Sequence, residues 1–296
     1  MSDAQSLIAA TVSLDDEAMI ETHPVPSSSS SASPPVSVTT TPASSKAWRA
    51  AWRRLEVLAG RGAVALFGAA EPPALSRIST GASALDDALM GGLPVGRLAE
   101  IAGPPGIGKT SLALGLCGVT QRRGGIAAVI DADGGLERTT LSRCGVDPKS
   151  LVIARPDSGE HALQIVDELL RAKAADLIVV DSVAALVPQA ELALPTGTAP
   201  AGHLARLMSQ SMRRLTLQAA KSRAVVVFIN QFRRSWKQDG IGYDVTTGGN
   251  ALVYAAATRL FLDRGAGAVS VTLHKARFGH EGRVVSLPFP GGKQAS

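Results

Sequence analysis

The segment from Gly103 to Thr110 reads GPPGIGKT and matches the phosphate-binding pattern G-x-x-x-x-G-K-[ST] at every specified position. Glycines in such a loop let successive backbone N–H groups turn toward one phosphate chain, while Lys109 adds a positive charge and the Thr110 hydroxyl can bind magnesium. An apolar run precedes the loop and SLALGLCGVT follows it, so strand, loop and helix N-terminus come in the expected order; an ordinary Gly/Pro turn is the alternative. We predict that phosphates are bound by Gly103, Pro104, Pro105, Gly106, Ile107, Gly108, Lys109, Thr110 and Ser111.

Asp181 ends the apolar run from Leu177 to Val180. The carboxyl end of a buried parallel strand is where such sheets bind their ligands, so Asp181 is a candidate magnesium ligand together with Thr110. On its own, an aspartate at this place is more often a cap or turn residue. The phosphate loop upstream reverses that preference.

Polar side chains also end two other apolar runs, IDADGG and AVVVFIN. Either Asp131 or Asp133 would be placed to orient or deprotonate the water that attacks a γ-phosphate, and a solvated acidic turn is the alternative. Asn230 and Gln231 cannot act as bases because their amides are neutral. They could instead contact the γ-phosphate end of the pocket and report the nucleotide state to the following loop.

That following loop reads FRRSWKQDGIGYDVTTGGN and is long for a compact α/β domain, which favours a functional role. Arg233, Arg234 and Lys237 could follow a phosphate backbone, while Trp236 or Tyr243 stacks on bases. A lid over a small molecule and a protein interface are the alternatives.

The whole chain has 296 residues, of which 45% are hydrophobic and 19% are charged, so it can bury a large core. A net charge of +5 is compatible with a polyanionic partner without requiring one. The two cysteines, Cys117 and Cys144, form no CxxC motif, so neither zinc nor a disulfide is expected. Because the chain has neither a signal peptide nor an apolar run long enough for a membrane span, we expect a cytoplasmic protein without a membrane partner.

Three regions are expected along the chain. Residues 1–45 are rich in Ser, Thr and Pro and are predicted to be a disordered tail. Residues 46–75 carry an amphipathic helix, KAWRAAWRRLEVLAG, and a short strand, AVALFG; the helix packs either on its own domain or on a partner. Residues 76–296 alternate apolar strands with amphipathic helices, which indicates an α/β fold with a mainly parallel sheet and helices on both faces.

These residues resemble the bacterial RecA recombinases. The phrases that carry the resemblance are ISTGASALDDALMGGLPVGRLAEI, GPPGIGKTSLALGL, IDADGGLE, GVDPKSLVIARPDSGEHALQIVDELL, DLIVVDSVAALVPQAEL, ARLMSQSMRRL, FINQFR and TTGGNAL. They follow the family's order and near-family spacing over roughly residues 48–289. The resemblance implies a RecA-type P-loop ATPase that polymerises on single-stranded DNA, with ATP and Mg²⁺ bound between neighbouring subunits and roles in homologous recombination, DNA repair and the SOS response.

The resemblance also assigns roles to individual residues. Asp133 stands at the position of the catalytic glutamate and Gln231 at that of the glutamine that senses the γ-phosphate. A first DNA loop is expected at about residues 191–202 and a second at about residues 232–250, and residues 47–68 would pack on the adjacent protomer. The implied DNA contacts are Arg206, Ser209, Arg213, Arg233, Trp236, Gly248, Gly249 and Asn250, and the implied cations acting across the subunit boundary are Lys275 and Arg277, whose i, i+2 spacing would place both on one side of a strand.

Several positions depart from the family pattern. Asp133 is one methylene shorter than glutamate, so we expect slow hydrolysis, and Thr140 stands where the family has an adenine-stacking tyrosine. Pro200 with Ala201 replaces a pair whose methionine wedges between bases, and Gly240 replaces a phenylalanine. The chain also ends soon after Phe289, so we expect the family's C-terminal DNA-gating domain to be missing.

Two other readings stay open on the sequence. One is an accessory RecA paralogue with weak or no catalysis, resembling the ImuA-like proteins, whose partner would be a DNA repair protein or a translesion polymerase. The other is a ring-forming motor that resembles the RadA or KaiC-type ATPases. The intact phosphate loop and TTGGNAL favour the filament-forming, DNA-dependent ATPase.

Overall fold

The computed structural model describes residues 45–60, 75–195, 202–236 and 242–288. The chain divides into two units, residues 1–72 and 73–296, and each is described by itself. The predicted tail at residues 1–45, apart from Ser45, and the predicted strand AVALFG lie outside the described residues, so both stay predictions.

The first unit contains the predicted amphipathic helix, α1 (Lys46–Ala59). Ser45 caps it by accepting a hydrogen bond from the Trp48 backbone N–H at 3.0 Å, and Gly60 ends it with a φ of 89°. The rings of Trp48 and Trp52 lie 5.7 Å apart. Within the described part of this unit the helix buries none of its residues, so its apolar face is available to another surface.

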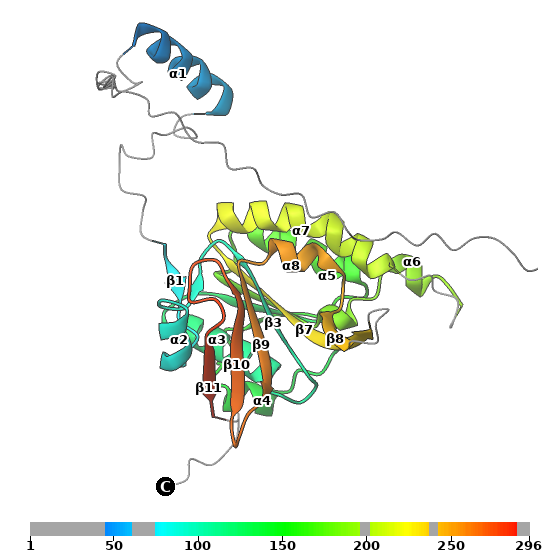
Figure 1. The fold of residues 1–296 in the computed structure, drawn as a ribbon. Helices are drawn as coiled ribbons and strands as arrows, with labels where there is room; N and C mark the ends of the chain where they lie inside the picture. Colours follow the sequence, from blue (N-terminus) through cyan, green and yellow to red (C-terminus); the bar gives the residue numbers. More distant parts are fainter. Residues whose placement is uncertain (1–44, 61–74, 196–201, 237–241, 289–296) are drawn as a thin grey trace, which may run out of the picture. The chain divides into compact units, whose positions relative to one another are not determined.

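The second unit is built on one large sheet with the strand order β11-β10-β9-β3-β7-β6-β4-β5 and with β8 paired to β7 (Figure 1). Six neighbouring strands are parallel: β9, β3, β7, β6, β4 and β5. The other three, β10, β11 and β8, pair antiparallel with their neighbours. The sheet is therefore mainly parallel, as the sequence predicted. The strands are β3 (Leu98–Gly103), β4 (Ala127–Asp131), β5 (Val152–Ala154), β6 (Leu177–Asp181), β7 (Val225–Trp236), β8 (Gly242–Thr246), β9 (Thr258–Arg264), β10 (Val269–Ala276) and β11 (Val284–Leu287). A separate small ribbon pairs β1 (Arg77–Ile78) with β2 (Leu93–Pro94).

Helices cover both faces of the sheet because successive strand residues point to opposite sides. On β3, Ala99 and Ile101 pack with α2, α3 and α4, whereas Leu98 packs with α5, α7 and α8 (Figure 1). The helices are α2 (Ser83–Ala88), α3 (Lys109–Arg122), α4 (Arg138–Arg143), α5 (Gly159–Arg171), α6 (Gln189–Leu192), α7 (His203–Ser222) and α8 (Asn250–Ala255), with a short 3₁₀ helix at Val183–Ala185.

The structure corrects the sequence analysis at two elements. The sequence pattern predicts a helix from about Gly134 to Cys144, but α4 has only six residues, because Gly134 adopts a φ of 68° and Glu137 is still extended. The segment expected to be a structureless loop after Asn230 is instead a β-hairpin: β7 continues to Trp236, and its last residues pair with β8, Phe232 opposite Thr246 and Trp236 opposite Gly242.

Candidate functional site

The phosphate loop joins the end of β3 to the start of α3. Gly106 and Gly108 adopt φ values of 71° and 98°, which other residues adopt only with strain. The Lys109 ammonium folds back into the loop and donates to the carbonyl oxygens of Gly103 at 3.0 Å and Pro104 at 2.7 Å. Burial lowers the pKa of Lys109, and the nearby Asp181 carboxylate opposes this shift. The loop therefore contains a buried ammonium group that is bound only by carbonyl oxygens. The charged oxygens of a phosphate would bind it more strongly.

Thr110 and Asp181, the two predicted magnesium ligands, contact each other directly although they lie on different elements. The Thr110 hydroxyl donates to Asp181 Oδ2 at 2.7 Å. Burial raises the pKa of Asp181 to about 6; the charges of Asp133 and Asp131 add to the rise, and the Thr110 hydrogen bond and the Lys109 charge oppose it. A buried carboxylate surrounded by acidic neighbours, with a hydroxyl beside it, is a hard oxygen donor set that fits Mg²⁺.

No group of three or more His, Cys, Asp or Glu side chains that could hold a metal occurs among the residues the structure describes. A magnesium ion here would therefore depend on nucleotide phosphates as well as on Thr110 and Asp181, which is how this ion is held in ATP-dependent enzymes.

Of the two aspartates in IDADGG, only one is open to the site. Asp131 is buried and its Oδ2 pairs with Arg155 Nε at 3.2 Å, which fixes the carboxylate to β5's C-terminal end. Asp133 is exposed, and its charge, like that of Asp131, adds to the raised pKa of Asp181. This difference favours Asp133 for contact with a bound nucleotide's water.

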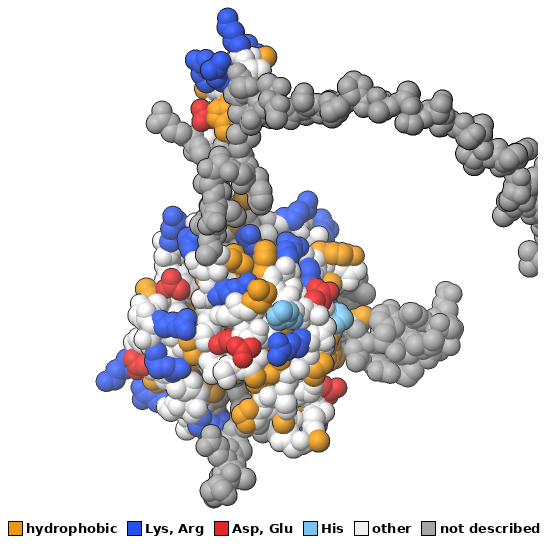
Figure 2. Space-filling model, turned by 60° about the vertical axis from the view of Figure 1, so that its left-hand side comes forward, with side chains coloured by type: hydrophobic (Ala, Val, Ile, Leu, Met, Phe, Trp, Pro, Cys, Tyr) orange, Lys and Arg blue, Asp and Glu red, His pale blue; other side chains and the backbone are white. Residues whose placement is uncertain are grey.

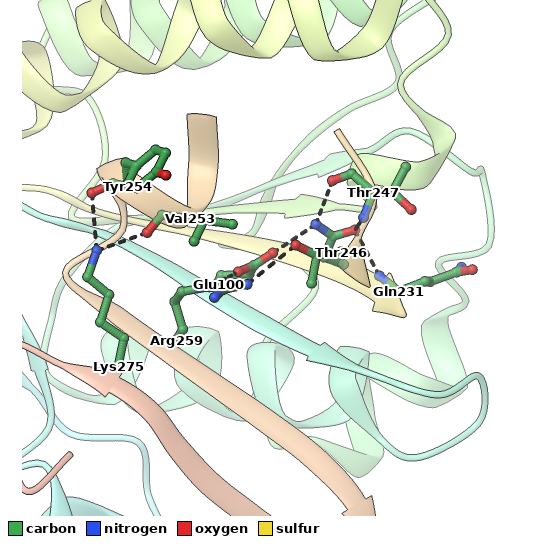
Figure 3. A network of polar contacts seen from close by, with 9 residues as sticks. Glu100, Gln231, Thr246, Thr247, Val253, Tyr254, Arg259 and Lys275 are labelled. Atoms are coloured by element: carbon green, nitrogen blue, oxygen red, sulfur yellow. Dashed lines mark hydrogen bonds and ion pairs between the residues drawn. The ribbon is translucent and has the colours of Figure 1, made fainter. Parts of the chain in front are cut away.

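Gln231 lies beside the phosphate loop. In the parallel pairing of β3 and β7 it stands opposite Gly103, the first residue of the loop. Its backbone N–H donates to Asn230 Oδ1 at 2.9 Å, while its side chain is exposed and points away from the buried contacts around Asn230 (Figure 3). Asn230 itself is completely buried, so it cannot touch a nucleotide as the sequence analysis allowed.

A pocket of about 270 Å³ opens next to the phosphate loop, between α3, α4 and the ends of β9, β10 and β11. Burial raises the pKa of Cys144 in its wall, while the Arg143 charge and a hydrogen bond with Ser111 lower it. Only the phosphate-loop side of this pocket, Ile107, Gly108 and Ser111, was predicted from the sequence, because the other lining residues belong to no motif. Its lining comprises Ala82, Ile107, Gly108, Ser111, Leu112, Arg143, Cys144, Leu262, Val269, Leu287 and Pro288.

The predicted DNA contacts gather where α7 meets the segment before α8. Arg206, Ser209 and Arg213 are exposed on α7, and their spacing of three and four residues places them on one helix face. A Cβ atom on Gly248 would lie 3.2 Å from Met208 Cγ, and one on Gly249 would lie 3.0 Å from Ala205 Cβ, so these glycines lie against the same helix. The two predicted DNA regions are therefore adjacent.

A groove of about 450 Å³ continues this surface between α7 and α8, lined by Ser209, Met212, Arg213, Thr216, Ala251, Tyr254 and Ala255. Residues 196–201 of the first predicted loop lie outside the described residues, as do the side chains of Arg233 and Trp236 in β7. The DNA roles of Arg233 and Trp236 stay predictions.

Lys275 and Arg277 do not share one side of a strand, contrary to the sequence analysis. β10 has an irregularity between Leu273 and Lys275 and ends at Ala276, so Arg277 lies beyond it. Lys275 Nζ donates to the carbonyl oxygens of Val253 at 2.9 Å and Tyr254 at 3.1 Å at the end of α8 (Figure 3). Burial lowers the pKa of Lys275, and the charges of Arg277 and Arg259 add to this shift.

Basic and acidic side chains are interspersed over the face of the second unit that Figure 2 presents. The net charge of +5 is thus not gathered there into one continuous basic surface. Within the part of the chain that the structure describes, no helix has the length and apolar character needed to span a bilayer.

Comparison with known proteins gives one consistent result. A family model described as the RecA N-terminal domain matches residues 46–285. Protein RecA of a Synechocystis species is 47% identical over 222 residues, which cover 74% of this chain and 62% of that protein. Protein RecA of a Nostoc species is 46% identical over 229 residues, or 76% of this chain and 63% of that protein, and that of Trichodesmium erythraeum is 46% identical over 74% and 61%. The chain thus spans less than two thirds of the length of these relatives.

Proposed function

The chain belongs to the RecA family, and from this premise we propose that it is a DNA-dependent ATPase that polymerises on single-stranded DNA for homologous recombination and DNA repair. The observation that carries the proposal is the course of β7. This strand places Gln231 opposite the phosphate loop and leads, through its hairpin with β8, to Gly248 and Gly249 against α7. One continuous segment therefore links the phosphate loop to the surface that we propose binds DNA.

The proposed chemistry divides among four residues. Lys109 stabilises the phosphate charge, Thr110 and Asp181 hold the magnesium ion, and Asp133 orients the attacking water. Magnesium, when bound, supplies further neutralisation of charge on the phosphates. Because aspartate is shorter than glutamate at the position of Asp133, we propose that hydrolysis is slow.

We propose that the nucleobase binds in the pocket of about 270 Å³ beside the phosphate loop. Its wall is mainly aliphatic, and an adenine ring could pack between the α3 and α4 side of the pocket and Leu262 of β9. Aliphatic side chains would then contact the adenine ring in place of a stacked aromatic ring, which Thr140 cannot provide.

We further propose that a second copy of the chain pairs with β5. This strand forms one edge of the sheet, and its Val152 and Ile153 are 42% and 40% exposed. An open apolar edge is a template for an added strand, and residues 63–68, AVALFG, have the composition to supply it from the neighbouring protomer. Lys275 and Arg277 would then act on the nucleotide of the adjacent subunit.

Fluorescence anisotropy of labelled oligo(dT) tests the DNA part of this proposal. We expect ATP-dependent binding, with an affinity that falls at least tenfold in the double variant Arg206→Ala/Arg213→Ala. The slope of log affinity against log salt concentration should become less steep by the amount expected for the loss of about two phosphate contacts. Arg264→Ala, which removes an exposed arginine at the end of β9, should stay within about twofold. Wild-type protein that binds ATP but no single-stranded DNA would contradict the proposal and support the accessory paralogue instead.

A further inference from the structure

A buried polar network joins β3, β7 and β9 (Figure 3). Its centre consists of Glu100, Asn230 and Arg259, which are 0%, 0% and 6% exposed. Arg259 Nε donates to Glu100 Oε2 at 2.5 Å, and Asn230 Nδ2 donates to Glu100 Oε1 at 2.8 Å. The roles proposed above for nucleotide and DNA binding use neither Glu100 nor Arg259, and burial excludes for Asn230 the direct nucleotide contact that the sequence allowed.

The Asn230 amide makes four hydrogen bonds, two as donor and two as acceptor. Its Nδ2 donates to Glu100 and, at 2.9 Å, to the Thr247 carbonyl oxygen. Its Oδ1 accepts from the backbone N–H of Gln231 at 2.9 Å and from that of Thr247 at 3.2 Å. An amide has two donor and two acceptor positions, so every position is used. Asn230 thus binds the backbone of the segments on both sides of the hairpin.

Glu100 and Arg259 determine which way this amide faces. Arg259 can only donate hydrogen bonds, and the Glu100 carboxylate that it pairs with can only accept them. The amino group of Asn230 must therefore face Glu100, and its oxygen must face the two backbone N–H groups. A reversed amide would oppose donors to donors in a buried site, which is unfavourable.

The segment that Asn230 holds has little room to move by itself. A Cβ atom on Gly248 would lie 3.1 Å from Val183 Cγ1, close to Asp181, and 3.2 Å from Met208 Cγ on α7. Among the described residues, the buried hydroxyl of Thr247 has no hydrogen-bond partner. A buried hydroxyl without a hydrogen-bond partner is uncommon. In a second conformation of this segment, the Thr247 hydroxyl could form the hydrogen bond that it lacks here.

We propose that Asn230 is a positioning residue that transmits the nucleotide state from Gln231 to the DNA-binding segment Thr247–Asn250, with Glu100 and Arg259 setting the orientation of its amide. The inference rests on the proposed function. One acceptor atom, Asn230 Oδ1, binds the backbone of both Gln231 and Thr247. A displacement of Gln231 by a γ-phosphate would therefore change the hydrogen bond that fixes Thr247, and the tight packing of Gly248 would pass the change to α7.

The test compares three variants of the full chain. Asn230→Ala removes the shared amide, Glu100→Gln removes the group that orients it, and Val226→Ala is the control. Val226 is completely buried on the same strand, so its truncation lowers stability without touching the network. Steady-state ATPase with and without oligo(dT) gives kcat and KM for each variant, and thermal unfolding gives the loss of Tm.

We expect Asn230→Ala to lose at least tenfold of the DNA stimulation of kcat, with the KM for ATP changed less than threefold. Glu100→Gln should show a smaller loss in the same direction, and Val226→Ala should keep the wild-type stimulation at a comparable loss of Tm. If Asn230→Ala matches Val226→Ala in both stimulation and Tm, its role is structural only and the inference is overturned.

Hydrogen exchange of the peptides that cover residues 229–250 separates this inference from the proposed function. A non-hydrolysable ATP analogue with Mg²⁺ should change exchange at residues 245–250 in the wild type but not in Asn230→Ala. Wild type that binds the analogue without such a change overturns the inference alone. Wild type that binds no nucleotide overturns the proposed function, and the coupling role with it.

Discussion

Asp181 is placed for ligand binding at the expense of stability. A carboxylate buried next to two other acidic residues is unfavourable unless a cation balances its charge, and burial raises its pKa to about 6. Thr110 and Lys109 compensate only in part. A cation bound beside Asp181, as proposed above for magnesium, would relieve this repulsion.

Replacing Asp181 with asparagine should therefore stabilise the ligand-free protein. The folded-state pKa of about 6 lies above the ordinary value of 3.8. Ionisation of Asp181 therefore lowers the free energy of unfolding fully above pH 6. This loss of stability shrinks as the pH falls toward 4 and is absent below that. Urea unfolding without nucleotide or magnesium should give a gain of roughly 1–3 kcal/mol for Asp181→Asn at pH 8.

The gain should shrink as the pH is lowered to 4.5, and magnesium-dependent ATP binding should be lost at every pH. Asp157→Asn, at an exposed aspartate on the surface, serves as the control and should show neither effect. An Asp181→Asn protein that is less stable than the wild type at pH 8 would contradict this account of the site.

At the scale of elements, the close approach of the Thr247–Gly249 segment to α7 depends on glycine. Gly248 has a φ of 91°, and its neighbours leave 3.1–3.2 Å for a Cβ atom. Gly267 has a similar φ of 75° with nothing within 4 Å of a Cβ atom. The two glycines therefore share the backbone strain of a left-handed residue and differ in crowding.

Gly248→Ala should destabilise the protein by about 2–3 kcal/mol, and Gly267→Ala by about 1 kcal/mol. The difference measures the packing of Gly248 on Val183 and Met208. Gly248→Ala should also weaken oligo(dT) binding about tenfold, whereas Gly267→Ala should not. Equal losses of stability in chemical unfolding would refute the tight contact with α7.

Hydrophobic periodicity and sequence motifs predicted most of the helices and strands. These signals failed where the structure of a segment depends on pairing with another segment. The strand–loop–helix order around Lys109 and the strand end at Asp181 follow from local patterns, so they were predictable from the sequence. The hairpin of β7 with β8 could not, because polar residues such as Arg233 and Ser235 become strand only through pairing across the turn. The fixation of Asp131 by Arg155 joins residues 24 positions apart, and no local signal predicts it.

At the scale of the whole molecule, assembly should depend on the two sheet edges unequally. The open edge at β5 presents Val152 and Ile153, and the edge at the other end, β11, presents Val284, which is 59% exposed. A charged side chain on an edge strand prevents the addition of another strand. If β5 receives a strand from a second copy, a lysine there should block assembly and a lysine on β11 should not.

We therefore expect Ile153→Lys to abolish filaments on single-stranded DNA with an ATP analogue, and Val284→Lys to leave them intact, in electron micrographs and light scattering. Both variants should keep a Tm close to that of the wild type because both side chains are exposed. Filaments that tolerate Ile153→Lys, or rings in place of filaments, would contradict pairing at β5.

The most direct measurement of the central claim is the steady-state ATPase rate of the full chain with and without single-stranded DNA. Lys109→Ala is the blank, because it removes the cation that the loop holds on its carbonyls. We expect a slow basal rate and an increase of at least tenfold with DNA in the wild type, and neither activity in Lys109→Ala. A folded wild-type chain that binds ATP yet shows no increase with DNA would contradict it.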